Sequence, residues 1–226
     1  MEGVTVLYCD NHLIAVWKDA GFVVQGRTRD EESLACRVRQ WIAVHFGKTG
    51  KVFLGVVHRL DRPVAGAVIF ARTSKAAARL SAEIRERRFV KEYLAVVDGE
   101  PSGRCERLDG YLSRHGVRSQ VSTQPGGGSQ RAIMTYRVVE RRAGRALLAV
   151  SLETGRRHQI RAQLSHAGYP IMGDRLYGGT GQLPVPGIAL LARRLSVRHP
   201  TRDVQVEIEA PIPEWWPWDI SAGTMV

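Results

Sequence analysis

Short apolar runs rich in β-branched residues recur along almost the whole chain, separated by Gly, Pro, Asn and Asp. Runs of this length, bounded by turn-forming residues, are typical of β-strands. The expected strands cover residues 4–9, 13–17, 64–71, 90–98, 108–121, 132–140 and 146–152. The first two form an expected hairpin around an Asp-Asn turn. Strands are therefore predicted to be the majority element of the fold, and the helices must lie between them.

Three helices are expected between these strands. Residues 31–46 carry apolar side chains at helical spacing, and Gly47 follows, as is common just past a helix end. Residues 74–88 also have a helical period, with arginines on the polar face that either are simply solvated or contact phosphates. A third helix is predicted over about 156–166, stopped by Gly168.

Two further segments leave alternatives open. The glycine-rich run at 124–130 is followed by no Lys-Ser or Lys-Thr pair, so it is predicted to be a hairpin tip and not a phosphate-binding loop. Near the C-terminus, Trp215, Trp216 and Trp218 either close the core or form a stacking platform for bases.

The charge balance indicates the kind of partner. The 226 residues include 33 Lys and Arg against 22 Asp and Glu, giving a formal charge of +11 and a pI near 10.2. Such an excess suits a polyanion, and the sequence contains neither a long apolar segment nor a basic amphipathic helix with an aromatic face. Nucleic acid is therefore a better expected partner than a membrane.

Chain length, composition and cysteine positions limit the class of protein that this sequence can encode. With 44% hydrophobic residues, the chain can bury a proper core, and we expect one domain over 1–226. The start lacks the features of a signal peptide, which predicts a cytoplasmic protein. The three cysteines are far apart, so they are expected to be buried small hydrophobes, and no disulfide framework or metal site is predicted.

The strongest candidate for chemistry is Asp61, which lies between Arg59 and Arg62 directly after an apolar run. Nearby cations favour the ionised form of a carboxyl group. An ionised Asp can act as a nucleophile or as an electrostatic stabiliser, and it is a poor general acid. The alternative is a structural Asp held in salt bridges.

A second polar cluster follows about a hundred residues later. Residues 154–161 read Thr-Gly-Arg-Arg-His-Gln-Ile-Arg and are dense in hydrogen-bond donors. On the predicted helix, Arg157 and Arg161 share a face at i, i+4. Cations at a helix N-terminus oppose the helix dipole, which favours a bound anion over a merely solvated turn.

These motifs, taken together, resemble the RluA family of pseudouridine synthases. The His-Arg-Leu-Asp signature with its following Gly is matched at 58–61 and Gly66, and the Lys-x-Tyr signature at 91–93. The 154–161 cluster, continued by residues 166–171 and 173–174, resembles the third signature. One departure is Val64-Ala65, where the family usually has Thr-Ser, and the two lost hydroxyls put the stability of the loop in question.

The resemblance implies both a fold and an activity. The fold would be α+β, a mixed, largely antiparallel sheet flanked by helices with a central catalytic cleft, as one catalytic domain without an N-terminal S4 domain. The activity would be isomerisation of specific uridines to pseudouridine in structured RNA, either rRNA or tRNA. The competing hypothesis is a non-catalytic RNA-binding module or assembly factor that retains the fold. A metal-dependent nuclease is not favoured, because the sequence shows no clustered carboxylates.

By similarity to the family, Asp61 would be the nucleophile, Tyr93 would stack on the uracil and take the C5 proton, and Arg161 would pair with Asp61. On spacing alone, a tyrosine in a strand such as Tyr93 is more often a core residue than a catalyst, and the resemblance is what favours catalysis. Further RNA-binding residues are expected among the neighbouring polar side chains: His58, Arg59, Arg62, Lys91, Arg156, Arg157, His158 and Gln159. The target uridine must leave the helical stack, and Arg59 either fills the gap or pairs with Asp61 or a phosphate. The isomerisation neither oxidises nor hydrolyses anything, so no cofactor is predicted.

Overall fold

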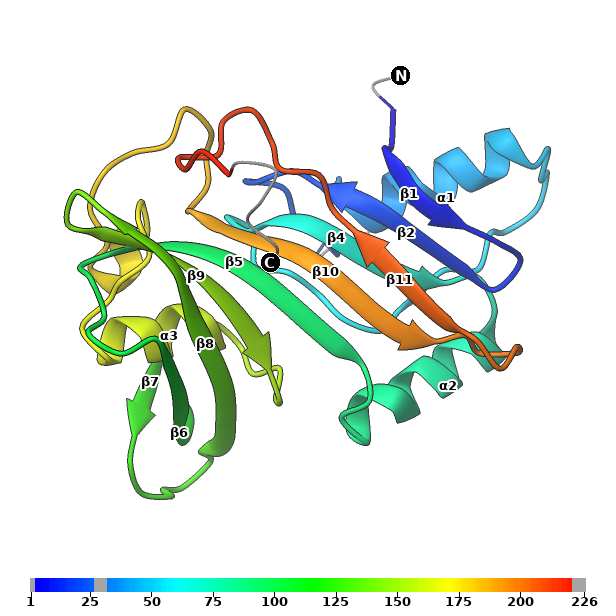
Figure 1. Cartoon of the computed structure of the whole chain (residues 1–226). Helices are drawn as coiled ribbons and strands as arrows, with labels where there is room; N and C mark the ends of the chain where they lie inside the picture. The colour runs from blue at the N-terminus through cyan, green and yellow to red at the C-terminus, as the bar shows by residue number, and fades with distance from the viewer. Residues whose placement is uncertain (1–2, 27–31, 221–226) are drawn as a thin grey trace. The chain divides into compact units, whose positions relative to one another are not determined.

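The structure, a computed structural model, describes residues 3–26 and 32–220. The chain divides into two compact units, each built from more than one stretch of sequence. The first comprises Met1–Val90 and Ala192–Pro211, and the second Lys91–Leu191 and Ile212–Val226. As predicted, the described residues form a mixed, largely antiparallel sheet accompanied by α-helices (Figure 1).

The first unit holds the N-terminal strands and two helices. Its elements are β1 (Val6–Cys9), β2 (Leu13–Lys18), α1 (Leu34–His45), β3 (Gly55–Val56), β4 (Ala65–Ala71), α2 (Ser74–Arg85), most of β10 (Leu190–Arg198) and β11 (Gln205–Glu209). The strand order is β1-β2-β4-β10, with β11 beside β10 and β3 beside β4. The predicted β1–β2 hairpin is confirmed: its turn is held by the Asp10 carboxylate, which accepts hydrogen bonds from the backbone N–H groups of His12 and Leu13 at 2.8 Å.

The core of the first unit explains why β4 reads as an uninterrupted apolar run. Every residue of β4 is buried, so both faces of this strand are covered. On one face, Ala67 and Ile69 pack in a cluster with Leu80 of α2 and Leu195 of β10. Burying a side chain such as Ile69 or Leu80 contributes about 1.5–3 kcal/mol, so this cluster fixes the strand that follows Asp61.

Capping residues set the helix boundaries in the first unit. The Ser33 hydroxyl caps α1, and Gly47, at φ +59°, ends it as predicted, while the expected start at residue 31 lies outside the described residues. The Thr73 hydroxyl caps α2 through the N–H of Ala76. The predicted end of α2 at residue 88 is wrong: the helix stops at Arg85, and Arg87 is left-handed at φ +58°.

The second unit is an antiparallel sheet with one α-helix. Its elements are β5 (Val90–Asp98), β6 (Cys105–His115), β7 (Arg118–Ser122), β8 (Gln130–Arg142), β9 (Arg145–Leu152), α3 (Gln159–His166) and the 3₁₀ turn η1 (Arg175–Tyr177). The strand order is β5-β9-β8-β6-β7, and every neighbouring pair is antiparallel. Helix α3 ends as predicted, with Gly168 left-handed at φ +89°.

Two predictions for this sheet are wrong. The single strand expected over 108–121 is a hairpin, β6–β7, which turns at Gly116 with φ +56°. The glycine run at 124–130 is not a hairpin tip, because β7 and β8 both flank β6 and do not pair with each other. The segment is instead an exposed connection that crosses from one side of β6 to the other, from the position opposite Tyr111 to the position opposite Leu112.

Burial tests the predictions for the C-terminal tryptophans and for the cysteines. Trp216 and Trp218 are buried, with exposed fractions of 7% and 5%, so they close the core rather than offer a stacking platform. The expectation that the cysteines are buried is wrong, because Cys9 and Cys36 are half-buried and Cys105 is exposed. Within 3–26 and 32–220, no helix is long and apolar enough to cross a membrane.

Candidate active site

Asp61 lies on the loop between β3 and β4, in the first unit. The Asp61 carbonyl accepts a hydrogen bond from the N–H of Val64 at 3.1 Å, which closes a tight turn just before the strand. His58 is bound to the same strand, since its Nε2 accepts the N–H of Ile69 at 3.0 Å and its ring meets Phe89 edge-on. The loop that carries Asp61 is therefore anchored on the rigid strand β4.

A buried lysine supports this loop from within the protein. Lys18 at the end of β2 has no exposed surface, and its Nζ donates to the carbonyls of Asp19, Phe22 and Arg62 at 2.9, 2.7 and 3.1 Å. Burial lowers the pKa of Lys18 to about 7, although the carboxylates of Asp19 and Asp61 act in the opposite direction. One ammonium group thus links the turn after β2 to the residue next to Asp61.

Arg62 reinforces the same connection. Its Nε donates to the Gly21 carbonyl at 2.9 Å, and its own carbonyl accepts the N–H of Gly21 at 2.8 Å. Arg59 and Arg62 are both exposed. The two bonds to Gly21 show that Arg62 contributes to loop structure.

The departure at Val64-Ala65 is accommodated by packing. Val64 is 2% exposed and Ala65 fully buried, so both apolar side chains lie in the protein interior. A hydroxyl at either position would need a buried hydrogen-bond partner, which an apolar side chain does not. Val64 and Ala65 therefore place no side-chain hydroxyl in the interior that would need a hydrogen-bond partner.

The second unit contains a buried ion pair at the predicted Arg161. The Nε and Nη2 of Arg161 meet the two carboxylate oxygens of Asp174 at 2.6 and 2.9 Å, and the side chains are 5% and 2% exposed. The guanidinium also lies 5.0 Å from the ring centre of Tyr177. This two-point contact fixes the plane of the guanidinium. Asp174 was matched in sequence as part of the third motif, but its role as this partner was not predicted.

Helix α3 begins later than predicted. It starts at Gln159 and not at residue 156, because His158 is left-handed at φ +54° and interrupts the helical path. Arg157 and Arg161 therefore do not share a helical face, and that argument for converging donors is wrong. The strained His158 is held by Tyr177, whose hydroxyl lies 2.9 Å from Nδ1 and also accepts the N–H of Ser119 at 2.7 Å.

Gln159 orders the loop before α3. It is 3% exposed; its Oε1 accepts from the Thr154 hydroxyl and the Arg156 N–H at 2.8 and 3.0 Å, and its Nε2 donates to the Ile133 carbonyl at 3.0 Å. Arg157 donates to the Val117 carbonyl at 2.7 Å. These bonds attach the donor-rich segment to β8 and to the turn that precedes β7.

Gly155 lies against Lys91 of β5. A Cβ at Gly155 would lie 2.8 Å from the Nζ of Lys91, so a side chain there would shift the ammonium group. Burial, and then the nearby charge of Arg156, lowers the pKa of Lys91. Sequence motifs two and three are thus adjacent at this point.

Tyr93 follows on the same strand and is 7% exposed, opposite Val150 of β9. Tyr93 and Arg161 belong to the second unit and Asp61 to the first. The structure therefore groups His58, Arg59, Asp61 and Arg62 on one loop and the remaining predicted residues in the other unit, while the pairing of Asp61 with Arg161 stays a prediction.

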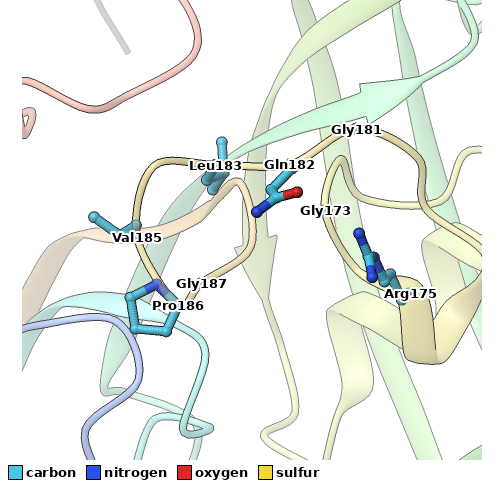
Figure 2. A pocket seen from close by; sticks show the side chains of 8 residues that line it. All are labelled: Gly173, Arg175, Gly181, Gln182, Leu183, Val185, Pro186 and Gly187. Atoms are coloured by element: carbon cyan, nitrogen blue, oxygen red, sulfur yellow. The ribbon is translucent and has the colours of Figure 1, made fainter.

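A hollow of about 230 Å³ lies beside Asp174, between its neighbours Gly173 and Arg175 and the loop before β10. Figure 2 shows Val185 and Pro186 on one side of this hollow and Arg175 on the other. None of the residues predicted as catalytic or RNA-binding lines it.

Comparison with known proteins identifies the family. A model described as RNA pseudouridylate synthase matches residues 12–166, a range that includes Asp61, Tyr93 and Arg161. The chain belongs to this family. It is 33% identical to the ribosomal large subunit pseudouridine synthase D of Pseudomonas aeruginosa, over 96% of this chain and 70% of that protein. It is also 33% identical to an uncharacterized RNA pseudouridine synthase of Bacillus subtilis, over 92% of this chain and 68% of the relative.

The fold agrees with this membership. The solved structure of human RNA pseudouridylate synthase domain containing 4 aligns with a TM-score of 0.77 at 20% identity, covering 94% of this chain and 90% of that one. The predicted RluA-type pseudouridine synthase fold is confirmed. The chain is an RNA uridine isomerase, and the hypothesis of a non-catalytic RNA-binding module is disfavoured.

Proposed function

We propose that this enzyme isomerises uridine in ribosomal large subunit RNA, in the cytoplasm, with Asp61 as nucleophile. The target class is supported by the printed names of relatives at 33% identity, which are ribosomal large subunit pseudouridine synthases. Transfer RNA is the other structured RNA that this chemistry fits. The observation that carries the catalytic assignment is the pre-set Arg161, buried and fixed by Asp174 at two points.

The proposed chemistry needs few groups. The N1–C1′ bond of uridine breaks, the uracil rotates, C5 bonds to C1′, and the C5 proton is transferred to N1 through the protein or solvent. Asp61 would attack the ribose or promote its elimination, Arg161 would keep Asp61 ionised, and Tyr93 would stack on the uracil and accept the C5 proton. A rigid guanidinium suits this role because it needs no reorganisation during reaction.

The remaining predicted residues divide by exposure into two proposed roles. Arg59, Arg156 and Arg157 are exposed and would contact phosphates, and Arg59 would also fill the stack left by the flipped uridine. His58 and Gln159 use their side chains in hydrogen bonds within the protein, so we assign them a positioning role.

The three other predicted RNA-binding residues have mixed surroundings. Arg62 is exposed yet bound to Gly21, Lys91 is close to Arg156, and His158 is bound to Tyr177. We propose that Lys91 contacts an RNA phosphate, because an anion relieves the repulsion between its ammonium group and Arg156. Arg62 and His158 then hold the loops in which the exposed arginines lie.

Site-resolved mapping of pseudouridine tests the proposal. Total RNA from cells with the gene deleted is compared after complementation with wild type, Asp61→Ala or the control Asp203→Ala, which removes an exposed carboxylate from the same unit. We expect loss of one or a few signals in large subunit rRNA, restored by wild type and by Asp203→Ala only. Restoration by Asp61→Ala would refute the nucleophile, and signals confined to tRNA would refute the proposed target.

A further inference from the structure

The C-terminal end of α1 carries three aromatic rings in mutual contact. Trp41 and His45 are stacked, with ring centres 4.4 Å apart and an interplanar angle of 12°. Phe46 meets both rings edge-on, at 6.1 Å from Trp41 and 4.8 Å from His45. We call these three residues the aromatic platform. None of them belongs to a motif that the catalytic assignment uses.

The aromatic platform lies at the exposed end of α1. The same helix buries Val38 and Ile42, with exposed fractions of 0% and 1%, and Trp41 of the platform is half-buried. His45 is exposed, Phe46 is 43% exposed, and the adjacent Val44 is 72% exposed. Large apolar groups that cluster on a surface mark interaction sites more often than single exposed residues do.

Positive charge surrounds the platform. Residues 33–60 contain five Lys and Arg and no Asp or Glu. Lys48 and Lys51 are exposed on the loop that follows Phe46. The guanidinium of Arg72 lies 4.2 Å from the Phe46 ring centre, and it is held there by hydrogen bonds to the Asp10 carbonyl and the Cys9 Sγ.

This combination of groups points to nucleic acid. Single-stranded nucleic acid binds where aromatic rings accept stacked bases and cations follow the backbone. Protein interfaces are depleted in lysine relative to the rest of the surface, so exposed lysines with no neighbouring acid in the sequence fit RNA better than a protein partner.

We propose that the aromatic platform stacks an unpaired base of the RNA substrate, while Lys48 and Lys51 contact the flanking phosphates. This site rests on the proposed function only in taking structured RNA as the substrate. It would bind a nucleotide other than the isomerised uridine, and it would add affinity that does not depend on base identity, because every base offers a π-face.

Two labelled oligonucleotides of equal charge test the stacking. The probes are a twelve-nucleotide oligouridylate and the corresponding abasic twelve-mer, with binding measured by fluorescence anisotropy. We expect the His45→Ala/Phe46→Ala variant to lose about fivefold or more in affinity for oligouridylate and nothing for the abasic strand. The control Val44→Ala removes exposed apolar area without a ring, and it should match wild type on both probes.

A second pair of variants tests the charge. Lys48→Gln/Lys51→Gln should weaken both probes equally and reduce the slope of log affinity against log salt by about 1.4. The control Arg198→Gln removes one exposed cation from β10 and should leave the preference for oligouridylate over the abasic strand unchanged. Thermal unfolding of each variant identifies loss of fold.

The outcomes separate this site from the proposed function. Equal binding of both probes by wild type, or a folded ring variant that keeps the full preference, overturns the platform. A wild-type dimer in sedimentation that the ring variant abolishes, with RNA affinity unchanged, assigns the surface to self-association instead. Pseudouridine formation by wild type on rRNA is scored independently, so failure of the platform leaves the proposed function standing.

Discussion

Removing the carboxylate of Asp174 should be among the most destabilising single changes in the second unit. Asp174→Ala would leave the guanidinium of Arg161, which is only 5% exposed, without its two-point partner. Loss of one member of a buried pair typically costs about 3–5 kcal/mol, because the remaining charge is neither paired nor hydrated. For a chain of this size, each kcal/mol lowers the melting temperature by about 2–4 °C, so a loss of about 10 °C is expected.

The assay is urea unfolding followed by circular dichroism, with two controls. Asp109→Ala breaks exposed pairs with Arg107 and Arg131 and should cost far less stability than Asp174→Ala. The double variant Arg161→Met/Asp174→Leu removes both charges, so it should be more stable than Asp174→Ala alone. A cost below about 1 kcal/mol for Asp174→Ala, or a double variant that is no more stable, would refute the argument that an orphaned buried charge dominates.

Three further predictions concern the first unit. The lowered pKa of Lys18, about 7, means that the folded state gives up this proton more readily than the unfolded chain. Between pH 7 and 9, the unfolding free energy of wild type in urea should therefore rise by about 2 kcal/mol relative to that of Lys18→Met. A difference in unfolding free energy that stays constant over this pH range contradicts the prediction. Burial would raise the pKa of Asp10, but its hydrogen bonds lower it to about 2. The Asp10 carboxylate should therefore contribute about 1 kcal/mol to the unfolding free energy above pH 4, and this contribution should vanish as the pH falls through 2. When stability is measured against pH in acid, Asp10→Asn should not show this loss. Gly66 has φ +124°, and Gly66→Ala would place a Cβ 2.4–2.8 Å from backbone atoms of Ala192, so we expect thermal unfolding to show a loss of about 3 kcal/mol or more. The control Gly126→Ala has open space around its Cβ and should change stability little. Equal stability of the two variants would exclude this clash.

The sequence predicted the elements that depend on local chemistry. The β1–β2 turn, the end of α1 at Gly47 and the end of α3 at Gly168 were correct, because a short polar side chain or a left-handed glycine determines each of them within a few residues. The continuous apolar run of β4 also predicted a strand correctly.

The errors arose where distant contacts override local preference. The start of α3 moved to Gln159 because Tyr177, which is far along the chain, holds His158 in a conformation that a non-glycine residue seldom adopts. The connection at 124–130 was misassigned because the periodicity of apolar residues predicts where strands lie in the sequence but not which strands are neighbours in the sheet.

The candidate site was predicted through motifs more than through physics. Residue spacing could not indicate that Asp174 is the partner of Arg161, because two buried charges thirteen positions apart meet only after the chain has folded back. Residue spacing also could not distinguish side chains that face solvent from those, such as Gln159, that form hydrogen bonds within the protein. A motif records which residue types occur together, and it does not record what each one touches.

The crossing of the β7–β8 connection past β6 has a consequence for how enzymes of this kind can diverge. The connection joins strands that are not neighbours, and three consecutive glycines at its centre have open space around them. Residues can therefore be inserted or deleted there without shifting the register of any strand pair. The segment is a position where a lineage can change the length of an exposed loop while the strand pairing of the second unit stays intact.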